Sequence, residues 1–413
     1  MLLKQNTLLV WLTNIMNKFN FSFVVFFLFM MINTSVPAQK VIDEPVAWQL
    51  AAQLENTDGT TSTGFAGAIN SVCGNVFVVA GGANFPDKLP WEGGKKHYSD
   101  EVHILEKKGE KFAWYKEANF KLPEPIAYCG NTSTPLGAVY AGGENDKGLS
   151  DKAFLLNWDA ETEQVLIKEL PNLPLKVTNI ALTSIGDVVY AIGGDEQHNS
   201  SDLFCFIDLK SHNPQWQPLP RLPLALANTT AVIQKGTDGY NIFIIGGRTK
   251  TPSQISTLHH TVFEYKTSKC TWKRLDDITN GGNKMNLSAA AGIPFGDHHI
   301  LILGGDNGVV FHQIETYLSK IALANTPAEK ERLTSEKNKL NTNHKGFYKG
   351  VLLYNTYTNR WTKVGELPFA AQVTTTATLW GDTVVLSNGE VKPGVRTPDV
   401  HMGKILISEK DAE

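Results

Sequence analysis

The sequence predicts an all-β fold in which six similar units of about four strands close into a ring: a six-bladed β-propeller with a helical insertion in its fifth unit. Three observations support this prediction. An apolar run that ends in two glycines recurs along the chain, a tryptophan follows most copies, and one strand-like segment near the start has no partner nearby. Repeats of roughly 50 residues with several short strands are typical of propellers, in which each repeat forms one blade.

The recurring run is a short apolar, strand-like segment followed by a glycine pair. The second glycine stands at positions 82, 143, 194, 247 and 305, and a degenerate sixth copy ends in Asn388-Gly389. The intervals are 61, 51, 53, 58 and 84 residues, which leaves room for four short strands in each unit. Glycine is favoured where the backbone needs conformations that other residues avoid. We therefore interpret the glycine pairs as determinants of fold and not of chemistry.

Tryptophan and Leu-Pro marks follow the glycine pairs in most units. Trp114, Trp216 and Trp361 each precede a Leu-Pro, Trp272 marks the fourth unit without one, and the second unit has Leu-Pro alone. A glycine pair with a later aromatic is the kelch pattern. No tryptophan follows the sixth glycine pair. The strand-like segment around Trp48, in turn, precedes the first unit and belongs to none of the six. We expect that segment to pair with the strand near residues 404–407, closing the ring and removing an exposed sheet edge.

The long interval before the sixth glycine pair contains an insertion. Residues 313–345 are polar and helix-prone, and Thr326-Pro327-Ala328-Glu329 supplies an N-cap, a proline in the first turn and a capping-box glutamate. The charged run from Glu329 to Lys339 is typical of a solvated helix face. A helical cap over one mouth of the propeller channel is the alternative interpretation.

The first 38 residues have the composition of a secretory signal. Lys18 precedes an almost wholly apolar run over residues 19–32, and small residues follow up to Ala38. We expect residues 1–38 to be a signal peptide and residues 39–413 to form one propeller domain, exported to the periplasm and free of the membrane after cleavage. An uncleaved N-terminal anchor is the alternative.

Composition excludes several functional classes. The 413 residues include 42% hydrophobic and 19% charged side chains, with a net charge of −3, so a folded core is expected and disorder is not. The sequence has neither an excess nor a stripe of basic residues, so nucleic-acid binding is not indicated.

The four cysteines, Cys73, Cys129, Cys205 and Cys270, stand more than fifty residues apart. This spacing predicts no metal site. Most of the cysteines stand in or beside apolar, strand-like segments, which favours buried free thiols over disulfides.

Charged residues directly follow five of the six glycine pairs. The six residues at this position are Ala83, Glu144, Asp195, Arg248, Asp306 and Glu390. Equivalent positions of a propeller lie around one mouth of its channel, where ligands bind. Each residue alone is most simply a solvated loop tip, but the set indicates a polar binding surface.

The loop from Asn388 to Thr397 differs from the other units. Pro393 and Gly394 turn the chain, so that Glu390 and Arg396, six residues apart, can face one pocket. A carboxylate can move protons, and a guanidinium can hold another carboxylate by two hydrogen bonds.

This loop resembles the signature of the N-acetylneuraminate epimerases, also called sialic acid mutarotases, which are six-bladed kelch propellers. Residues 81–100 and 304–361 are similar to further blocks of that family, and the order of the blocks resembles its cyclically permuted branch. The resemblance implies interconversion of the α- and β-anomers of a sialic acid, with no metal or cofactor. It implies that Glu390 is the proton acceptor and that Arg396 engages the substrate carboxylate. Four further residues are candidates for substrate binding: Arg248, Glu144, Asp306 and Asn84.

Three other functions are known alternatives for a propeller of this kind, and the sequence argues against two of them. A non-catalytic kelch propeller that binds a sugar or a protein partner is the main alternative. A sialidase would need repeated Ser-x-Asp-x-Gly-x-x-Trp boxes, which are absent. A copper radical oxidase would need convergent histidines, whereas His259-His260 and His298-His299 are adjacent pairs whose side chains point to opposite faces of a strand.

Overall fold

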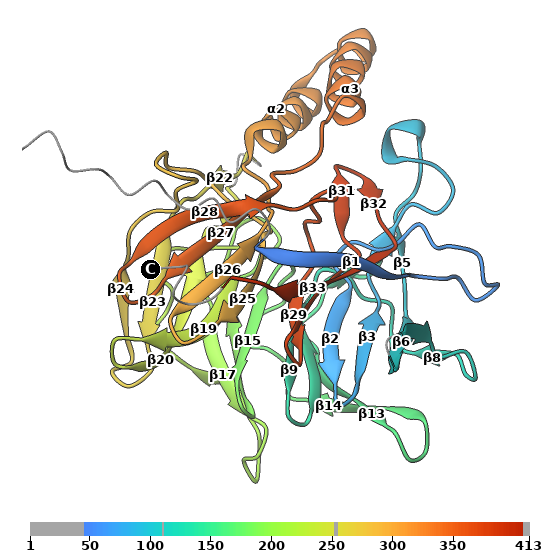
Figure 1. The fold of residues 1–413 in the computed structure, drawn as a ribbon. Coiled ribbons are helices and arrows are strands. Elements are labelled where there is room, and N and C mark those ends of the chain that lie inside the picture. The colour runs from blue at the N-terminus through green and yellow to red at the C-terminus, as the bar shows by residue number, and fades with distance from the viewer. Residues whose placement is uncertain (1–44, 110, 252–254, 408–413) are drawn as a thin grey trace, which may run out of the picture. The chain divides into compact units, whose positions relative to one another are not determined.

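The computed structural model describes residues 45–407, except residue 110 and residues 252–254, and shows β-sheets arranged around a central axis (Figure 1). The predicted all-β, six-bladed propeller is confirmed. The expected signal peptide, residues 1–38, lies outside the described residues.

Blades 1 to 3 are antiparallel sheets whose strands follow one another from the axis outward. Blade 1 contains β2 (Ile69–Cys73), β3 (Val76–Ala80), β6 (Glu101–Lys108) and β7 (Lys111–Trp114), with β8 (Phe120–Lys121) beside β6. Blade 2 contains β9 (Gly130–Thr134), β10 (Gly137–Ala141), β13 (Ala153–Asp159) and β14 (Gln164–Leu170). Blade 3 contains β15 (Ala181–Ile185), β16 (Val188–Ile192), β17 (Phe204–Asp208) and β18 (Gln217–Pro218).

Blades 4 and 5 have the same order, and blade 6 combines both ends of the domain. Blade 4 contains β19 (Thr230–Gly236), β20 (Gly239–Ile245), β23 (Val262–Lys266) and β24 (Thr271–Arg274). Blade 5 contains β25 (Ala291–Phe295), β26 (His299–Leu303), β27 (Gly350–Asn355) and β28 (Arg360–Glu366). Blade 6 contains β29 (Ala377–Trp380), β30 (Thr383–Ser387), β33 (Asp399–Ile405) and, outermost, β1 (Val46–Gln53).

The ring closes through the pairing of β1 with β33. Ala47 lies opposite Lys404 and Trp48 opposite Gly403 in this antiparallel pair. The innermost strands contact their neighbours around the axis, and β29 of blade 6 contacts β2 of blade 1. The first and last strands of the domain therefore share a sheet, so that no blade is left incomplete.

The hydrophobic core lies between adjacent blades. In the described part of the chain, each cluster of buried apolar side chains joins two neighbouring blades. Between blades 3 and 4, for example, the rings of Phe204 and Tyr265 lie 4.7 Å apart. Trp272 packs on both and donates from Nε1 to the carbonyl oxygen of Pro220 in the preceding blade at 2.9 Å. Trp216 makes the same kind of bond, from Nε1 to the Pro171 carbonyl oxygen at 2.8 Å, so these tryptophans tie their blades to the preceding ones.

Each glycine pair lies where an inner strand leaves its sheet. Gly81 and Gly82 have φ of 61° and 94°, and a Cβ on Gly82 would lie 2.6 Å from that of Phe65. In the degenerate sixth copy, Asn388 takes the first position with φ of 59°. Asparagine tolerates this left-handed conformation better than most residues. Its Oδ1 also accepts a hydrogen bond from the backbone N–H of Phe65 at 3.1 Å.

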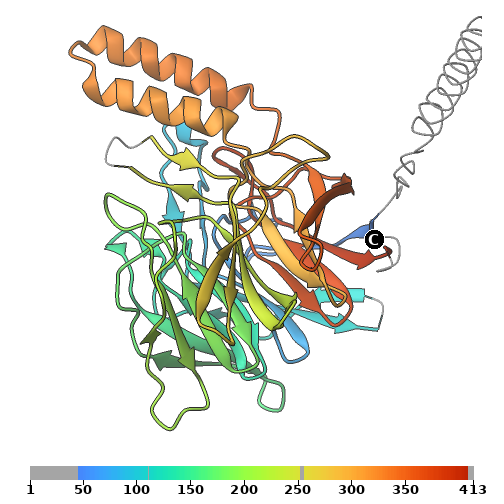
Figure 2. The ribbon, with the colours of Figure 1, turned by 90° about the vertical axis from the view of Figure 1, so that its left-hand side faces the viewer.

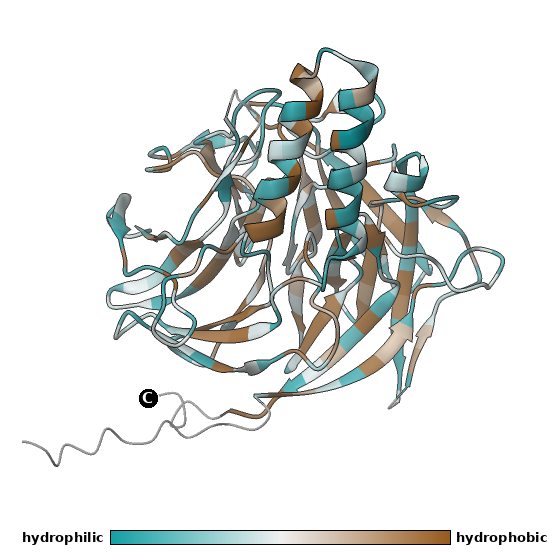
Figure 3. Ribbon diagram, turned by 90° about the horizontal axis from the view of Figure 1, so that it is seen from above, coloured by the Kyte–Doolittle hydropathy of each residue, from teal (hydrophilic) through white to brown (hydrophobic). Residues whose placement is uncertain are grey.

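Short hairpins and two helices follow the glycine pairs at one end of the propeller (Figures 1 and 2). The hairpins are β4 (Ala83–Asn84) with β5 (His97–Tyr98), β11 (Glu144–Asn145) with β12 (Gly148–Leu149), β21 (Arg248–Thr249) with β22 (Thr257–Leu258), and β31 (Glu390–Lys392) with β32 (Val395–Arg396). The helices, α2 (Val309–Leu323) and α3 (Pro327–Thr342), form an antiparallel pair that mixes polar and apolar residues, while the strands below are largely hydrophobic (Figure 3).

The helical insertion begins four residues before the polar segment predicted from the sequence. The side chains of Asp306 and Asn307 accept hydrogen bonds from the N–H groups of Gly308 and Val309, which start α2. Thr326 caps α3 by accepting from Glu329 N at 3.2 Å, with Pro327 in the first turn. None of the helices that the structure describes has both the length and the apolar character needed to span a membrane.

Candidate functional site

The six residues that follow the glycine pairs occupy equivalent positions around one mouth of the channel. Each forms an isolated β-bridge with a residue just before an inner strand: Ala83 with Ala66, Glu144 with Ala127, Asp195 with Thr178, Arg248 with Ala227, Asp306 with Ser288, and Glu390 with Val373. The backbone geometry is thus the same in every blade, and only the side chains differ. The chemistry of this mouth is therefore set by which residue each blade places there.

A second ring lies directly inside the first. Its members are Gly67, Tyr128, Asn179, Asn228, Ala289 and Thr374, all with positive φ. Backbone hydrogen bonds of 2.8–3.0 Å link five of the six neighbouring pairs, and the six members together line a cavity of about 120 Å³ on the axis. The sequence analysis did not identify this ring. Its signal is regular spacing, because each member precedes its partner in the first ring by 16 to 20 residues.

Glu390 and Arg396 face each other across the β31–β32 hairpin. Arg396 Nη1 donates to Glu390 Oε1 at 2.6 Å, and the Gly394 backbone N–H donates to the same oxygen at 3.0 Å. The Glu390 side chain is 19% exposed and that of Arg396 only 4%. The turn predicted at Pro393-Gly394 therefore brings the two side chains together and supplies a third group that holds the carboxylate.

Residues from blades 1 and 2 enclose the Arg396 guanidinium from the other side. Its Nε donates to the Ala83 carbonyl oxygen at 3.2 Å, and its Nη2 donates to the Tyr128 hydroxyl at 3.3 Å. The Phe85 ring lies 4.7 Å from the guanidinium carbon, a cation–π contact. Burial raises the pKa of Tyr128, and the positive charge of Arg396 opposes that rise. In this structure Arg396 contacts Glu390 and is largely buried, and its expected contact with a substrate carboxylate stays a prediction.

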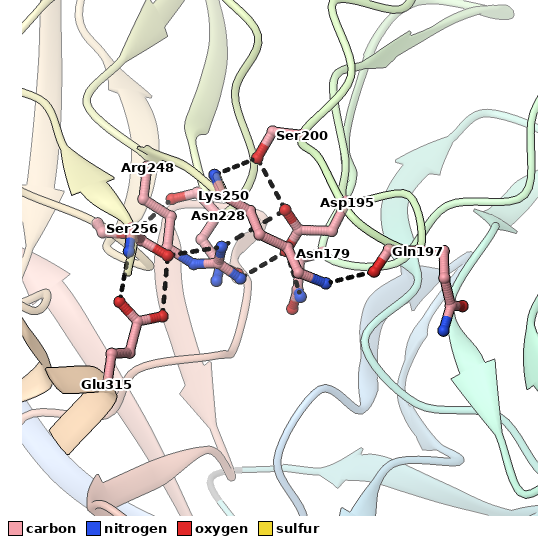
Figure 4. A network of polar contacts seen from close by, with 10 residues as sticks. Asn179, Asp195, Gln197, Ser200, Asn228, Arg248, Lys250, Ser256 and Glu315 are labelled. Atoms are coloured by element: carbon pink, nitrogen blue, oxygen red, sulfur yellow. Dashed lines mark hydrogen bonds and ion pairs between the residues drawn. The ribbon is translucent and has the colours of Figure 1, made fainter. Parts of the chain in front are cut away.

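Arg248 belongs to a separate network at the same mouth (Figure 4). Its Nη2 lies 2.5 Å from Asp195 Oδ2, and the two side chains are 11% and 3% exposed. Asp195 also accepts from Ser200 Oγ at 2.8 Å and from Asn179 Nδ2 at 3.2 Å. Sequence analysis placed Arg248 and Asp195 on equivalent positions but did not predict that they would neutralise each other. Arg248 therefore reaches the mouth as half of a buried ion pair.

The network extends to the helical insertion. Glu315 on α2 accepts from the Ser256 backbone N–H at 2.6 Å and from Ser256 Oγ at 2.9 Å (Figure 4). Phe311, also on α2, lies 5.8 Å from the Arg248 guanidinium carbon. These contacts fix α2 against the β21–β22 hairpin, which is part of the mouth.

Glu144 and Asn84 lie on the blade 1 and blade 2 side. Glu144 Oε1 accepts from the Tyr98 hydroxyl at 2.8 Å and from Lys96 Nζ at 3.3 Å. Burial raises the pKa of Tyr98, and the hydrogen bond to Glu144 adds to that rise. Asn84 is buried, with Nδ2 donating to Thr63 Oγ1 at 3.2 Å. Its Oδ1 has no hydrogen-bond partner among the described residues, so that acceptor is available.

Asp306 opens onto a cavity of about 440 Å³ beneath the helical insertion. The cavity is also lined by Lys339 of α3 and by His344, Lys345 and Tyr348 of the segment that follows. Burial raises the pKa of Asp306, and the negative charge of Glu390 raises it further. Sequence analysis gave no role to His344 because the residue lies in the insertion, outside the repeat pattern.

His344 has a defined tautomer in this cavity. Its Nδ1 accepts a hydrogen bond from the Gly346 backbone N–H at 3.0 Å. Burial lowers its pKa, and Lys392 lowers it further while Glu390 opposes. The neutral ring therefore carries its proton on Nε2, which makes His344 a hydrogen-bond donor.

The fold and the site together define a kelch-type β-propeller. One mouth of its channel holds the Glu390–Arg396 ion pair and the carboxyl group of Asp306, which forms no ion pair with a described lysine or arginine. Comparison with known proteins agrees with this class. The N-acetylneuraminate epimerase family model matches residues 170–412, which include Glu390 and Arg396, and the chain belongs to this family.

Curated relatives carry the same name. The chain is similar to N-acetylneuraminate epimerase of Haemophilus influenzae (strain PittEE), with 28% identity over 234 residues, which cover 57% of this chain and 59% of that protein. It is similar to N-acetylneuraminate epimerase of Salmonella typhimurium (strain LT2), with 28% identity over 242 residues and coverages of 56% and 57%. The chain thus spans somewhat more than half the length of the curated relatives it matches.

Proposed function

We propose that this protein interconverts the α- and β-anomers of N-acetylneuraminate by opening and reclosing the sugar ring, with Glu390 as the base. Membership of the N-acetylneuraminate epimerase family supports the substrate and the reaction. The observation that carries the role of Glu390 is its geometry. Oε1 is held by Arg396 and Gly394, while Oε2 has no hydrogen-bond partner among the described residues.

The reaction needs a base at the anomeric hydroxyl and an acid at the ring oxygen. Glu390 Oε2 accepts the proton of the anomeric hydroxyl as the bond from the anomeric carbon to the ring oxygen breaks. The open keto form then rotates, and closure on the other face of the carbonyl gives the opposite anomer. Proton transfer of this kind typically accelerates a reaction about 10²- to 10⁴-fold. Arg396 acts in this scheme by fixing the carboxylate in place.

The test is proton NMR of sialic acid anomers. The α-anomer is released by a sialidase, the purified protein is added, and the equatorial H3 signal is followed as it converts to that of the β-anomer. We expect accelerated conversion with the wild-type protein and the uncatalysed rate with Glu390→Gln. The exposed Glu169→Gln on β14 is the matched control and should retain the wild-type rate. Conversion at the uncatalysed rate with the wild-type protein would contradict the proposal, and ligand-induced shifts without acceleration would favour a sugar-binding propeller.

A further inference from the structure

Two carboxyl groups occupy equivalent positions in adjacent blades, in opposite electrostatic settings. Glu390 in blade 6 pairs with the Arg396 guanidinium. The carboxyl group of Asp306 in blade 5 accepts one backbone hydrogen bond, from Gly308 at 2.8 Å, and no lysine or arginine within the described ranges forms an ion pair with it. The two groups nonetheless interact, because the charge on Glu390 acts on Asp306. One carboxyl group thus has a cationic partner, while its neighbour has none among the described residues.

The surroundings of Asp306 favour the protonated form more than those of an ordinary aspartate do. The side chain is partly buried at the start of α2, and this burial raises its pKa; the hydrogen bond from Gly308 opposes the rise, and the charge of Glu390 adds to it. The other titratable groups that line the same cavity are Lys339 on α3 and His344, Lys345 and Tyr348 after it. Both lysines are exposed to solvent, where their charges are screened. Active sites often assign the acid and base roles to two titratable groups whose surroundings shift their pKa values in opposite directions.

We propose that Asp306 is the acid partner of Glu390 and donates its proton to the ring oxygen of a sugar held in the cavity beneath α2 and α3. This assignment rests on the proposed function. It adds a catalytic role to a residue that the sequence indicated only as a substrate contact. It also gives the helical insertion a purpose, since α2, α3 and the segment after them form the walls of this cavity.

The proton transfers balance without any other reactant. On opening, Glu390 takes the proton of the anomeric hydroxyl, the carbonyl forms, the bond to the ring oxygen breaks, and its electron pair takes the proton of Asp306. On closure each proton returns, because the hydroxyl formed from the ring oxygen gives its proton back to Asp306 while Glu390 protonates the carbonyl oxygen. The pair carries one negative charge throughout. The repulsion that favours the protonated form of Asp306 therefore disappears as Glu390 is neutralised, when Asp306 must release its proton.

His344 is the competing donor in the cavity. Its neutral ring presents an Nε2–H, since Nδ1 accepts from Gly346. A neutral imidazole is a far weaker acid than a carboxyl group, and the lowered pKa of His344 disfavours the imidazolium that would be stronger. We therefore assign His344 to hydrogen bonding of a substrate oxygen and Asp306 to proton donation.

The experiment measures the pH dependence of the catalysed anomerisation rate in wild-type and Asp306→Asn proteins. Asparagine keeps an oxygen that can accept from Gly308, so the start of α2 is preserved, but it has no proton to give. The matched control is Asp208→Asn at the end of β17, where the aspartate makes the same contact with the N–H two residues later, at 2.9 Å. We expect Asp306→Asn to lose about 10²- to 10⁴-fold in rate. We also expect it to lose the alkaline decline that ionisation of Asp306 causes in the wild type, whereas Asp208→Asn keeps both.

A second measurement follows the titration of Asp306 directly and does not depend on enzyme activity. The carboxyl carbons of ¹³C-labelled aspartate are titrated by NMR, and the Asp306 signal is the one absent from Asp306→Asn. We expect it to titrate above the ordinary aspartate range in the wild type and to move down in Glu390→Gln, which lacks the neighbouring charge. An ordinary titration that Glu390→Gln leaves unchanged overturns the assignment. So does an active Asp306→Asn with an unaltered alkaline decline while Glu390→Gln is inactive, a result that leaves the proposed function intact. An inactive wild-type protein overturns both.

Discussion

The guanidinium of Arg396 and the carboxylate of Glu390 lie 2.6 Å apart across a four-residue turn, and the arginine is the more buried of the two. Backbone and side-chain groups of blades 1 and 2 hold the arginine, while the glutamate keeps one oxygen toward the channel mouth. The pair thus has an inner, fixed member and an outer, reactive one. This asymmetry suggests that Arg396 orients the base and does not itself contact the substrate.

Arg396→Lys tests this division of roles. A lysine keeps the charge, but its single ammonium group cannot reach Glu390, the Ala83 carbonyl and the Tyr128 hydroxyl in the fixed geometry of a guanidinium. We expect kcat to fall about 10- to 100-fold through misplacement of the carboxylate, with KM changed by less than about threefold. Steady-state kinetics by NMR measures both. Arg221→Lys, at an exposed ion pair with Asp202, is the matched control. A large rise in KM with kcat retained would instead place the substrate carboxylate on Arg396.

The sequence predicted the fold well because the repeat is a backbone requirement. Every glycine pair meets the same left-handed geometry, and even Asn388 obeys it, so the number of units could be counted. The Glu390–Arg396 contact was predictable because both residues lie in one short turn. The partners of Arg396 were not, because Ala83, Phe85 and Tyr128 reach it only through closure of the ring, more than 260 residues away along the chain.

The Arg248–Asp195 pair was missed for a related reason. The repeats placed both residues on equivalent positions of neighbouring blades, but the sequence contains no information on which neighbours turn toward each other. The cavity beneath the insertion could not be predicted from the sequence for a different reason: residues 343–348, which line it, belong to no repeat. Local patterns therefore predicted which blade contributes which side chain, while the pairing of side chains between blades required the structure.

The Asp195–Arg248 pair predicts a large loss of stability when the acid is removed. Both side chains are nearly inaccessible, so Asp195→Asn leaves a buried guanidinium without its counter-charge. Breaking a buried pair in this way typically costs about 3–5 kcal/mol. Urea unfolding should show this loss, whereas Asp202→Asn, which breaks the exposed pair with Arg221, should cost less than about 1 kcal/mol. Equal effects of the two substitutions would contradict the importance of burial.

The cysteines predict a graded reactivity. In the structure all four are free, with Cys270 exposed and the other three buried. Burial raises the pKa of each of Cys73, Cys129 and Cys205 to about 12, which suppresses the reactive thiolate. We expect Ellman's reagent at pH 8 to modify one thiol in the native protein and four after denaturation. Cys270→Ser should abolish the native reaction, and two thiols after denaturation would indicate a disulfide instead.

The raised pKa of Asp306 predicts how the stability of the folded protein changes with pH. Its pKa is raised in the folded state by burial first and by Glu390 second, so folding favours the protonated form. The contribution is present in full below the pKa of the unfolded chain and is lost as pH rises through the raised folded value. Asp306→Asn cannot ionise and escapes this loss. The stability of this variant relative to wild type should therefore increase with pH and level off above the folded pKa. Urea unfolding of both proteins from pH 4 to pH 9 measures the difference. A difference that is constant with pH would mean that Asp306 has the same proton affinity folded and unfolded, and would remove the electrostatic basis for its role as an acid.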